Sequence, residues 1–438
     1  MQQHLIEQYQ QHKNKLIGYK EPWLVELREQ ALAYFIDQGL PTTRQENYKY
    51  TNLSKLAKAT YQLSELNNHV EQETIDALAI NSHSTLLVFV NGHYSAAHSR
   101  INESQENLYI ASLATALKEK GKLVSNYLGK QVSLENSITA LNTVLHQDGM
   151  VIAIGKDIQL EHPVELLFLH HKEDNSMQHV RNLIIADEHS HATIIEHHYA
   201  LDDIEYLKTV VTEIDCCANS HVHFYKIQNE STKATQLSQI DVHQHRDSCF
   251  KYMGLDIGGK LVRNDINTKS LSSNAYCQLN GLYITNHKQH VDNHTLIEHL
   301  SPHSTSSEFF KGIVDDKSRA VFNGSVIVHE GAIKTDAQQT NANLLLSSDA
   351  EIDTKPQLEI YNDDVKCAHG ATIGQLDEDA LFYLRSRGIN EKDAKALLTF
   401  GFAKSLINTI PEATIKHKLT QLVLQKLDAT QSIKEFLS

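Results

Sequence analysis

The chain has 438 residues, more than the ~100–200 residues of one typical domain, so we expect one elongated core with appendages or two to three domains. Its 54 acidic side chains outnumber 40 basic ones and give a formal net charge of −14. Such an acidic surface repels phosphate backbones and anionic lipids, so we expect neither nucleic acid nor a membrane as a partner. Five cysteines without any C-x-x-C pair argue against a disulfide framework or a zinc ribbon and predict free thiols in a reducing compartment.

The N-terminal part of the chain shows helical punctuation. Residues 1–15 are polar and rich in Gln, without the basic and apolar regions of a secretion signal, so we expect a cytoplasmic protein. Apolar side chains then recur at helical spacing from Pro22, and Gly39 ends the pattern, which predicts an amphipathic helix. Residues 44–53 are aromatic and charged but follow no period, so periodicity alone predicts a loop there.

A first strand is predicted over residues 85–90, ending in a turn at Asn91 and Gly92. From about residue 149 a long series of short apolar strands follows, separated by Asn, Asp, Gly and Ser. These strands are predicted at 151–154, 164–169, 182–185, 192–196, 209–214, 221–227, 320–328 and 343–346. No helix-period segment interrupts them, which argues against a βαβ fold and leaves a sandwich, a barrel or a β-solenoid. The length of the series favours the solenoid, because coils stack without limit and each contacts only its neighbours.

Helical signals return near the C-terminal end. Asp377 is predicted to cap a helix that ends at Gly388, with Arg385 and Arg387 near its negative end. Taken alone, the two arginines indicate a solvated face that complements the helix dipole. Pro411 is predicted in the first turn of the last helix. The chain is therefore predicted to be mainly β, with a helical or mixed domain at 1–148, a β core at 149–372 and a helical domain at 373–438.

Known catalytic motifs are incomplete or missing. The nearest approach to a nucleotide-binding G-x-x-x-x-G-K-[ST] loop is 254–260, but Leu261 stands where a hydroxyl is required and no helix pattern follows. There is no G-x-S-x-G elbow and no H-E-x-x-H helix. We therefore expect that any energy from ATP is supplied by another subunit.

Two groups of side chains could carry chemistry. His290, Asp292 and His294 share one face if their segment is a strand, and such donors can hold Zn, Fe or Mn. Polar ladders are also common on solenoid faces, and we expect this one to be structural, without a stable metal. Cys367 and His369 also project the same way in a strand, so thiol and imidazole could reach one iron or sulfur atom, although a buried Cys is often only structural.

The second half of the chain resembles the SufD family almost throughout. The matching segments are 291–295, 298–299, 311–312, 319–324, 344–347, 354–360, 363–372 and 382–388. Residues 41–53 resemble the family's early motif, with Tyr48 where a Trp is common. The related SufB pattern has a Glu-containing motif where this chain reads Cys367-Ala-His369. The chain therefore resembles the SufD family more than its SufB relatives.

The resemblance implies a fold and a set of partners. It implies a right-handed parallel β-helix core with helical ends, pairing with a SufB homologue, and a C-terminal helical domain that docks a SufC ABC-type ATPase. The residues that match this docking segment are Phe382, Tyr383, Arg385 and Arg387. The family relation leaves open a homodimer when SufB is absent.

The resemblance also implies a role. The chain would be a non-catalytic scaffold on which an iron–sulfur cluster is built transiently near the SufB–SufD interface, with His369 contributing and Cys367 close by. No cofactor would be stably bound, although a reduced flavin in the complex is compatible with the family. Two alternatives predict different observations: a His-ligated metalloenzyme would hold stoichiometric metal, and a β-helix carbohydrate-active enzyme would be secreted and carry a carboxylate or Lys/Arg cleft.

Overall fold

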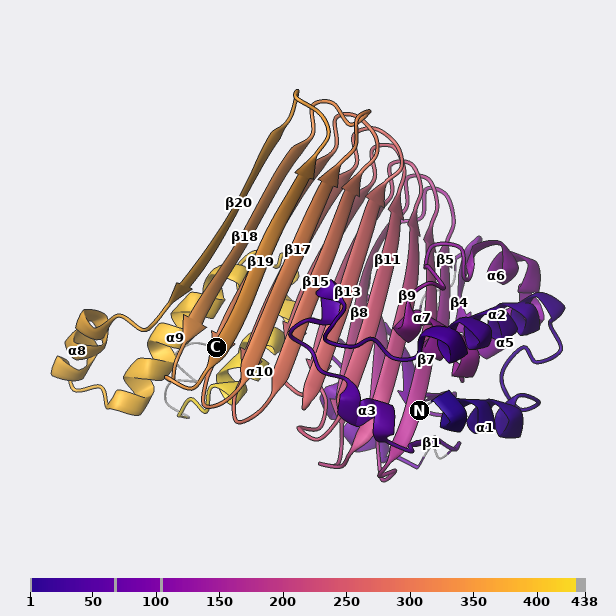
Figure 1. Cartoon of the computed structure of the whole chain (residues 1–438), viewed down its shortest axis with the longest axis horizontal. Helices are drawn as coiled ribbons and strands as arrows, with labels where there is room; N and C mark the ends of the chain where they lie inside the picture. The colour runs from indigo at the N-terminus through magenta and orange to yellow at the C-terminus, as the bar shows by residue number, and fades with distance from the viewer. Residues whose placement is uncertain (1, 67–68, 103–104, 431–438) are drawn as a thin grey trace.

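The structure, a computed structural model, describes residues 2–66, 69–102 and 105–430. Its centre is a parallel β-solenoid built from two long sheets, which run side by side along the long axis of the molecule (Figure 1). Sheet A contains, in spatial order, β19 (Glu351–Ile360), β17 (Arg319–Val328), β15 (His290–His299), β13 (Leu261–Ser270), β11 (Thr235–Gln244), β9 (Tyr206–Cys216), β7 (Ser176–Ala186), β5 (Met150–Ile154) and β4 (Leu108–Ser112), with β1 (Gln62–Leu63) beside β7. Sheet B contains β20 (Lys366–Gly374), β18 (Asp336–Leu345), β16 (Thr305–Val314), β14 (Tyr276–Thr285), β12 (Cys249–Asp256), β10 (His221–Asn229), β8 (His191–Ala200), β6 (Val164–His170), β2 (Thr85–Val90) and β3 (His93–Tyr94). The predicted mainly β solenoid is confirmed.

Each coil gives one strand to each sheet, and consecutive coils stay in register. Leu261 pairs with His290, and His290 pairs with Arg319 on the next coil. The turns between the strands share one backbone feature. Most turns contain one residue at positive φ, such as Asn219 at 59° and Asp316 at 53°, and Asn, Asp and His tolerate this conformation better than other side chains with a Cβ.

Apolar side chains fill the inside of the solenoid, while helices cover part of the outer face of each sheet and leave β17 and β19 of sheet A uncovered (Figure 1). The N-terminal helices are α1 (Gln2–His12), α2 (Pro22–Gln38), α3 (Ser54–Lys58), α4 (Gln72–Leu78), α5 (Leu113–Glu119), α6 (Gly121–Tyr127) and α7 (Ser137–Leu145), with a 3-10 turn at Glu46–Tyr48. Helix α7 packs on sheet A through Leu141, which shares one apolar cluster with Met177 and Leu207. On the other side, α9 (Glu391–Ile407) and α10 (Ala413–Lys426) pack on sheet B, where Phe400 and Ile415 share a cluster with Leu255. These contacts bury the apolar side chains of the helices and of the strands beneath them.

The helix and strand limits agree with several local predictions. Helix α2 begins at Pro22 and is capped by Gly39, and β2 spans Thr85–Val90 before a turn in which Asn91 and Gly92 both have positive φ. One prediction is wrong: α10 begins at Ala413 with Glu412 as its N-cap, so Pro411 precedes the helix. The carboxylate of Glu412 accepts from Tyr225, which holds the start of the helix against sheet B.

Strands from the N-terminal part of the chain join the core sheets. Strand β2 pairs with β6 in parallel, and β4 pairs with β5 in antiparallel fashion. The residue ranges predicted for the three domains stay a prediction. No helix within the described part of the chain is long and apolar enough to cross a membrane.

Candidate functional site

The C-terminal end of the solenoid is open. Strand β20 pairs with β18 along one edge, and no described strand pairs with its other edge; β19 ends sheet A in the same way. Large apolar side chains are exposed here, namely Ile360, Tyr361 and Ile373. Because an uncovered strand edge presents unpaired N–H and C=O groups, it is a template for pairing with another chain.

Cys367 and His369 lie on this last strand. Strand β20 places Cys367 beside Ala337 and His369 beside Gln339 of β18, and both β18 residues are buried. The half-buried Cys367 packs against the apolar interior of the solenoid, whereas His369 is exposed. Since side chains alternate along a strand, the two residues share the inner face of the last coil.

The thiol of Cys367 is not activated within the isolated chain. Burial, together with the negative charge of Asp336, raises the pKa of Cys367 in spite of a hydrogen bond with the backbone of Ala337. The protonated thiol is a poor nucleophile and a poor iron ligand. A partner that adds positive charge or iron at this end of the solenoid would therefore be needed to form the thiolate.

The structure adds a buried carboxyl group that sequence reasoning missed. Glu308 of β16 lies beside Gln339, which in turn lies beside His369, so three neighbouring strands place them in one row. The side-chain amide of Gln339 donates to Glu308 over 2.7 Å between Nε2 and Oε2, and both residues are buried. Burial raises the pKa of Glu308 to about 7. The sequence did contain a signal for the burial of Glu308. Glu308 stands two residues before Phe310, and side chains two residues apart lie on the same face of a strand.

We expect Glu308→Gln to change the pH dependence of stability. The folded pKa of about 7 lies above the unfolded value of 4.5, so the protonated acid contributes stability fully below pH 4.5, and this contribution is lost as pH rises through 7. The free energy of unfolding of the variant relative to the parent should therefore increase by about 3 kcal/mol between pH 5 and pH 8. Urea unfolding at both pH values measures this difference. The exposed Glu161→Gln serves as control, and an equal difference at the two pH values for Glu308→Gln would contradict the prediction.

Helix α8 (Glu378–Ser386) stands apart from the solenoid beyond the end of β20 (Figure 1). Asp377 caps it by accepting from the backbone N–H groups of Asp379 and Ala380. Leu381 is its one buried residue. A short capped helix that buries so little of its own surface is available to another protein.

The side chains predicted for partner binding are on the surface of α8 and its C-cap. Phe382 is 73% exposed and Tyr383 is 56% exposed. Arg387 donates to the hydroxyl of Tyr383 at 3.2 Å, and its guanidinium lies 5.2 Å from the ring centre. Arg385 lies 3.5 Å from Glu391 at the start of α9. The arrangement exposes two aromatic rings flanked by two guanidinium groups, which is a composition typical of interface hot spots.

The ladder of His290, Asp292 and His294 serves another set of contacts. Asp292 accepts from Arg263 at 2.6 Å and from Thr51 at 2.5 Å through Oδ2, and its Oδ1 lies 2.9 Å from His294. These bonds tie the aromatic segment 44–53 to the outside of sheet A. Among the described residues no group of His, Cys, Asp or Glu is arranged to hold a metal ion. The absence of a stable metal at this ladder stays a prediction.

Comparison with known proteins agrees with this architecture. Residues 168–402 match the family model described as "SUF system FeS cluster assembly, SufBD core domain", and residues 1–166 match the SufBD protein N-terminal region. The iron–sulfur cluster assembly protein SufD of Escherichia coli is 32% identical over 405 residues, covering 91% of this chain and 92% of that protein. The chain belongs to the SufD family.

Other members of the family cover the chain to a similar extent. A SufBD family protein of Synechocystis is 31% identical and covers 93% of this chain and 92% of its own length. SufD of Bacillus subtilis is 27% identical and covers 93% of this chain and 95% of its own length. The similarity to SufD proteins therefore includes both the helical ends and the solenoid.

Proposed function

We propose that this SufD-family chain is a scaffold subunit for iron–sulfur cluster assembly in the cytoplasm, without catalytic activity of its own. The observation that carries the proposal is the open end of the solenoid, where the unpaired strand carries the exposed His369 and the half-buried Cys367. The match to the SufBD core model over residues 168–402 supports the same conclusion. The cluster is the cargo of this site and not a resident cofactor.

The partner at the open end is proposed to be a SufB homologue. A related solenoid can continue the sheets through β19 and β20, since main-chain groups supply the hydrogen bonds for strand addition and the exposed Ile360 and Ile373 supply apolar contact. The site is incomplete in the single chain because Cys367 and His369 supply few ligands for a cluster. Residues from the partner would complete it, and a reduced flavin in the complex could supply electrons.

The second partner is proposed to be a SufC-type ATPase that binds α8. Residues 254–260, the segment closest to a nucleotide loop, run from β12 into the turn before β13, and a strand in place of a helix offers no N-terminal phosphate site. ATP hydrolysis is therefore assigned to the partner. Movement of the C-terminal helices during its cycle would act on β20 through the short connection from Gly374 to Asp377.

Co-purification of tagged chain with co-expressed SufB and SufC homologues tests both contacts. Phe382→Ala combined with Tyr383→Ala should weaken ATPase binding by about tenfold or more, because exposed aromatic anchors dominate such interfaces, while leaving the SufB homologue bound. Ile373→Asp should release the SufB homologue and leave the ATPase bound, since it places a charge in the proposed apolar contact. Ile333→Ala, at an exposed turn, is the matched control. Retention of both partners by both variants would rule out the proposed surfaces.

A further inference from the structure

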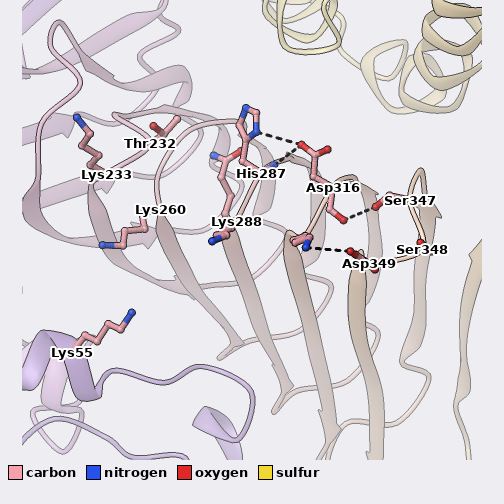
Figure 2. A pocket seen from close by; sticks show the side chains of 12 residues that line it. Lys55, Thr232, Lys233, Lys260, His287, Lys288, Asp316, Ser347, Ser348 and Asp349 are labelled. Atoms are coloured by element: carbon pink, nitrogen blue, oxygen red, sulfur yellow. Dashed lines mark hydrogen bonds and ion pairs between the residues drawn. The ribbon is translucent and has the colours of Figure 1, made fainter.

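A large open groove lies along the turns that lead from sheet B to sheet A. Its volume is about 1020 Å³, and it extends from the turn before β11 to the turn before β19, with α3 contributing Lys55 (Figure 2). No residue of β19, β20 or α8 is among the lining residues of this groove, and the proposed function does not use it.

Successive coils each place one lysine along this groove. Lys233, Lys260, Lys288 and Lys317 occupy the turns before β11, β13, β15 and β17. The turns are held together by backbone bonds, for example from the N–H of Lys317 to the carbonyl of His287 at 3.0 Å. Coils in a parallel solenoid are spaced by about 4.8 Å, so the row is on the order of 14 Å long.

Charge is distributed unevenly within the groove. Lys233 and Lys317, at the two ends of the row, are paired with Asp203 at 3.2 Å and with Asp349 at 3.6 Å. Within the described part of the chain, no ion pair or side-chain hydrogen bond joins Lys55, Lys260 or Lys288 to another residue. These three residues are exposed, and Figure 2 shows them on one side of the groove, away from Asp349.

The remaining carboxylate of the groove, that of Asp316, is turned toward the neighbouring His287. Asp316 accepts from the backbone N–H of His287 at 2.9 Å and lies 3.4 Å from the imidazole of that residue. Five lysines and only two carboxylates, those of Asp316 and Asp349, line the groove, on a chain whose net charge is −14. Such a local reversal of sign attracts anions against the field of the whole molecule.

The shape and lining of the groove indicate which anion fits. The described lining contains no Phe, Tyr or Trp, so there is no stacking platform of the kind that binds nucleotide bases or single-stranded nucleic acid. The row of lysines is as long as about four extended residues of a peptide. We propose that this lysine groove binds an extended acidic segment of a partner protein, with Lys55, Lys260 and Lys288 facing its carboxylates.

The test is binding of a fluorescein-labelled peptide of alternating Glu and Gly to the full-length chain, followed by fluorescence anisotropy at low and high salt. The parent should bind the Glu peptide but not the same peptide with Gln, and binding should weaken with salt. The triple variant Lys55→Gln, Lys260→Gln and Lys288→Gln should bind about tenfold more weakly or not at all. Asp349→Asn, which releases Lys317, should bind more tightly than the parent.

A matched triple variant controls for net charge. Lys13→Gln, Lys118→Gln and Lys122→Gln remove the same charge from exposed positions of the N-terminal part and should leave binding unchanged. Equal weakening by the two triple variants would overturn the proposal, because only the overall charge would then matter. Inorganic tripolyphosphate that binds the groove while the Glu peptide does not would overturn it as well, in favour of a phosphate site. Each assay uses the isolated chain, so its outcome is independent of cluster assembly.

Discussion

A strain whose sole cluster-assembly system carries His369→Ala is expected to lose cluster-dependent enzyme activity by on the order of tenfold to a hundredfold. The reason is that His369 is the exposed imidazole on the unpaired terminal strand, where the nascent cluster is proposed to form. The substitution should leave folding intact, because substitutions at exposed positions usually change stability by about 0.5 kcal/mol or less. Enzyme activity in extracts and thermal unfolding of the purified chain measure the two effects.

Two further variants make this experiment specific. His417→Ala removes another exposed imidazole, on α10, and should behave like the parent strain. Cys367→Ala should produce a smaller effect, seen mainly under iron or oxidative stress, because the thiol is half-buried and its pKa is raised. Normal growth and normal enzyme activity of the His369→Ala strain would remove His369 from the proposed site.

The largest loss of stability is expected for Arg263→Met. Arg263 is buried and joins Asp292 at 2.6 Å, Asp265 at 2.8 Å and the carbonyl of Asn47 at 2.8 Å, while its guanidinium lies 3.9 Å from the ring centre of Tyr48. Its removal leaves a buried carboxylate without its main counter-charge, which costs about 3–5 kcal/mol. It also releases the segment 44–53, so both denaturant unfolding and proteolysis of this segment report the change.

The effect of Arg263→Met should depend on pH. Although burial raises the pKa of Asp292, Arg263 and His294 hold it well below its usual range. The stability that this carboxylate contributes is therefore present above its unfolded pKa of about 3.9 and is lost as pH falls through the depressed folded value. The difference in the free energy of unfolding between parent and variant should be largest near neutral pH and should shrink in acid.

A neighbouring ion pair supplies the control. Lys269 lies on the same strand, 3.0 Å from Glu298, and its side chain is 38% exposed. Lys269→Met should change stability by about 1 kcal/mol or less, because water screens such pairs. The double variant Arg263→Met/Asp292→Asn should be more stable than Arg263→Met alone, since it also removes the unpaired charge of Asp292. If Arg263→Met loses no more stability than Lys269→Met, the buried pair of Arg263 and Asp292 contributes little to the stability of the fold.

Local elements could be predicted from the sequence because their signals lie within a few residues. Pro22 and Gly39 mark the limits of α2, and the Oδ1 atom of Asp377 caps α8 through bonds to residues two and three positions on. The solenoid class also followed from local information, namely the long series of short strands without helices. The spacing of Cys367 and His369 predicted that they share one face of a strand, and the resemblance to the SufD family implied their role; the structure places both on β20.

Strand length and side-chain partners depended on the tertiary structure. Strand β7 was predicted over 182–185 but extends from Ser176 to Ala186, and all of its residues are buried. The alternation of buried and exposed side chains is lost in β7 because this strand is covered on both faces, by the solenoid interior and by the N-terminal helices. Polar side chains such as Asn182 find partners on neighbouring strands, including Thr212.

The most distant contacts had no local signal at all. Residues 44–53 lack any period because the contacts that hold them lie across the chain: Thr51 reaches His290, 239 residues away in sequence. The row of Glu308, Gln339 and His369 and the row of lysines likewise exist only because stacked coils bring residues separated by one coil into register. Short-range patterns encode where a helix or strand begins, whereas the stacking of coils determines which side chains meet, since each coil takes its neighbours from another part of the chain.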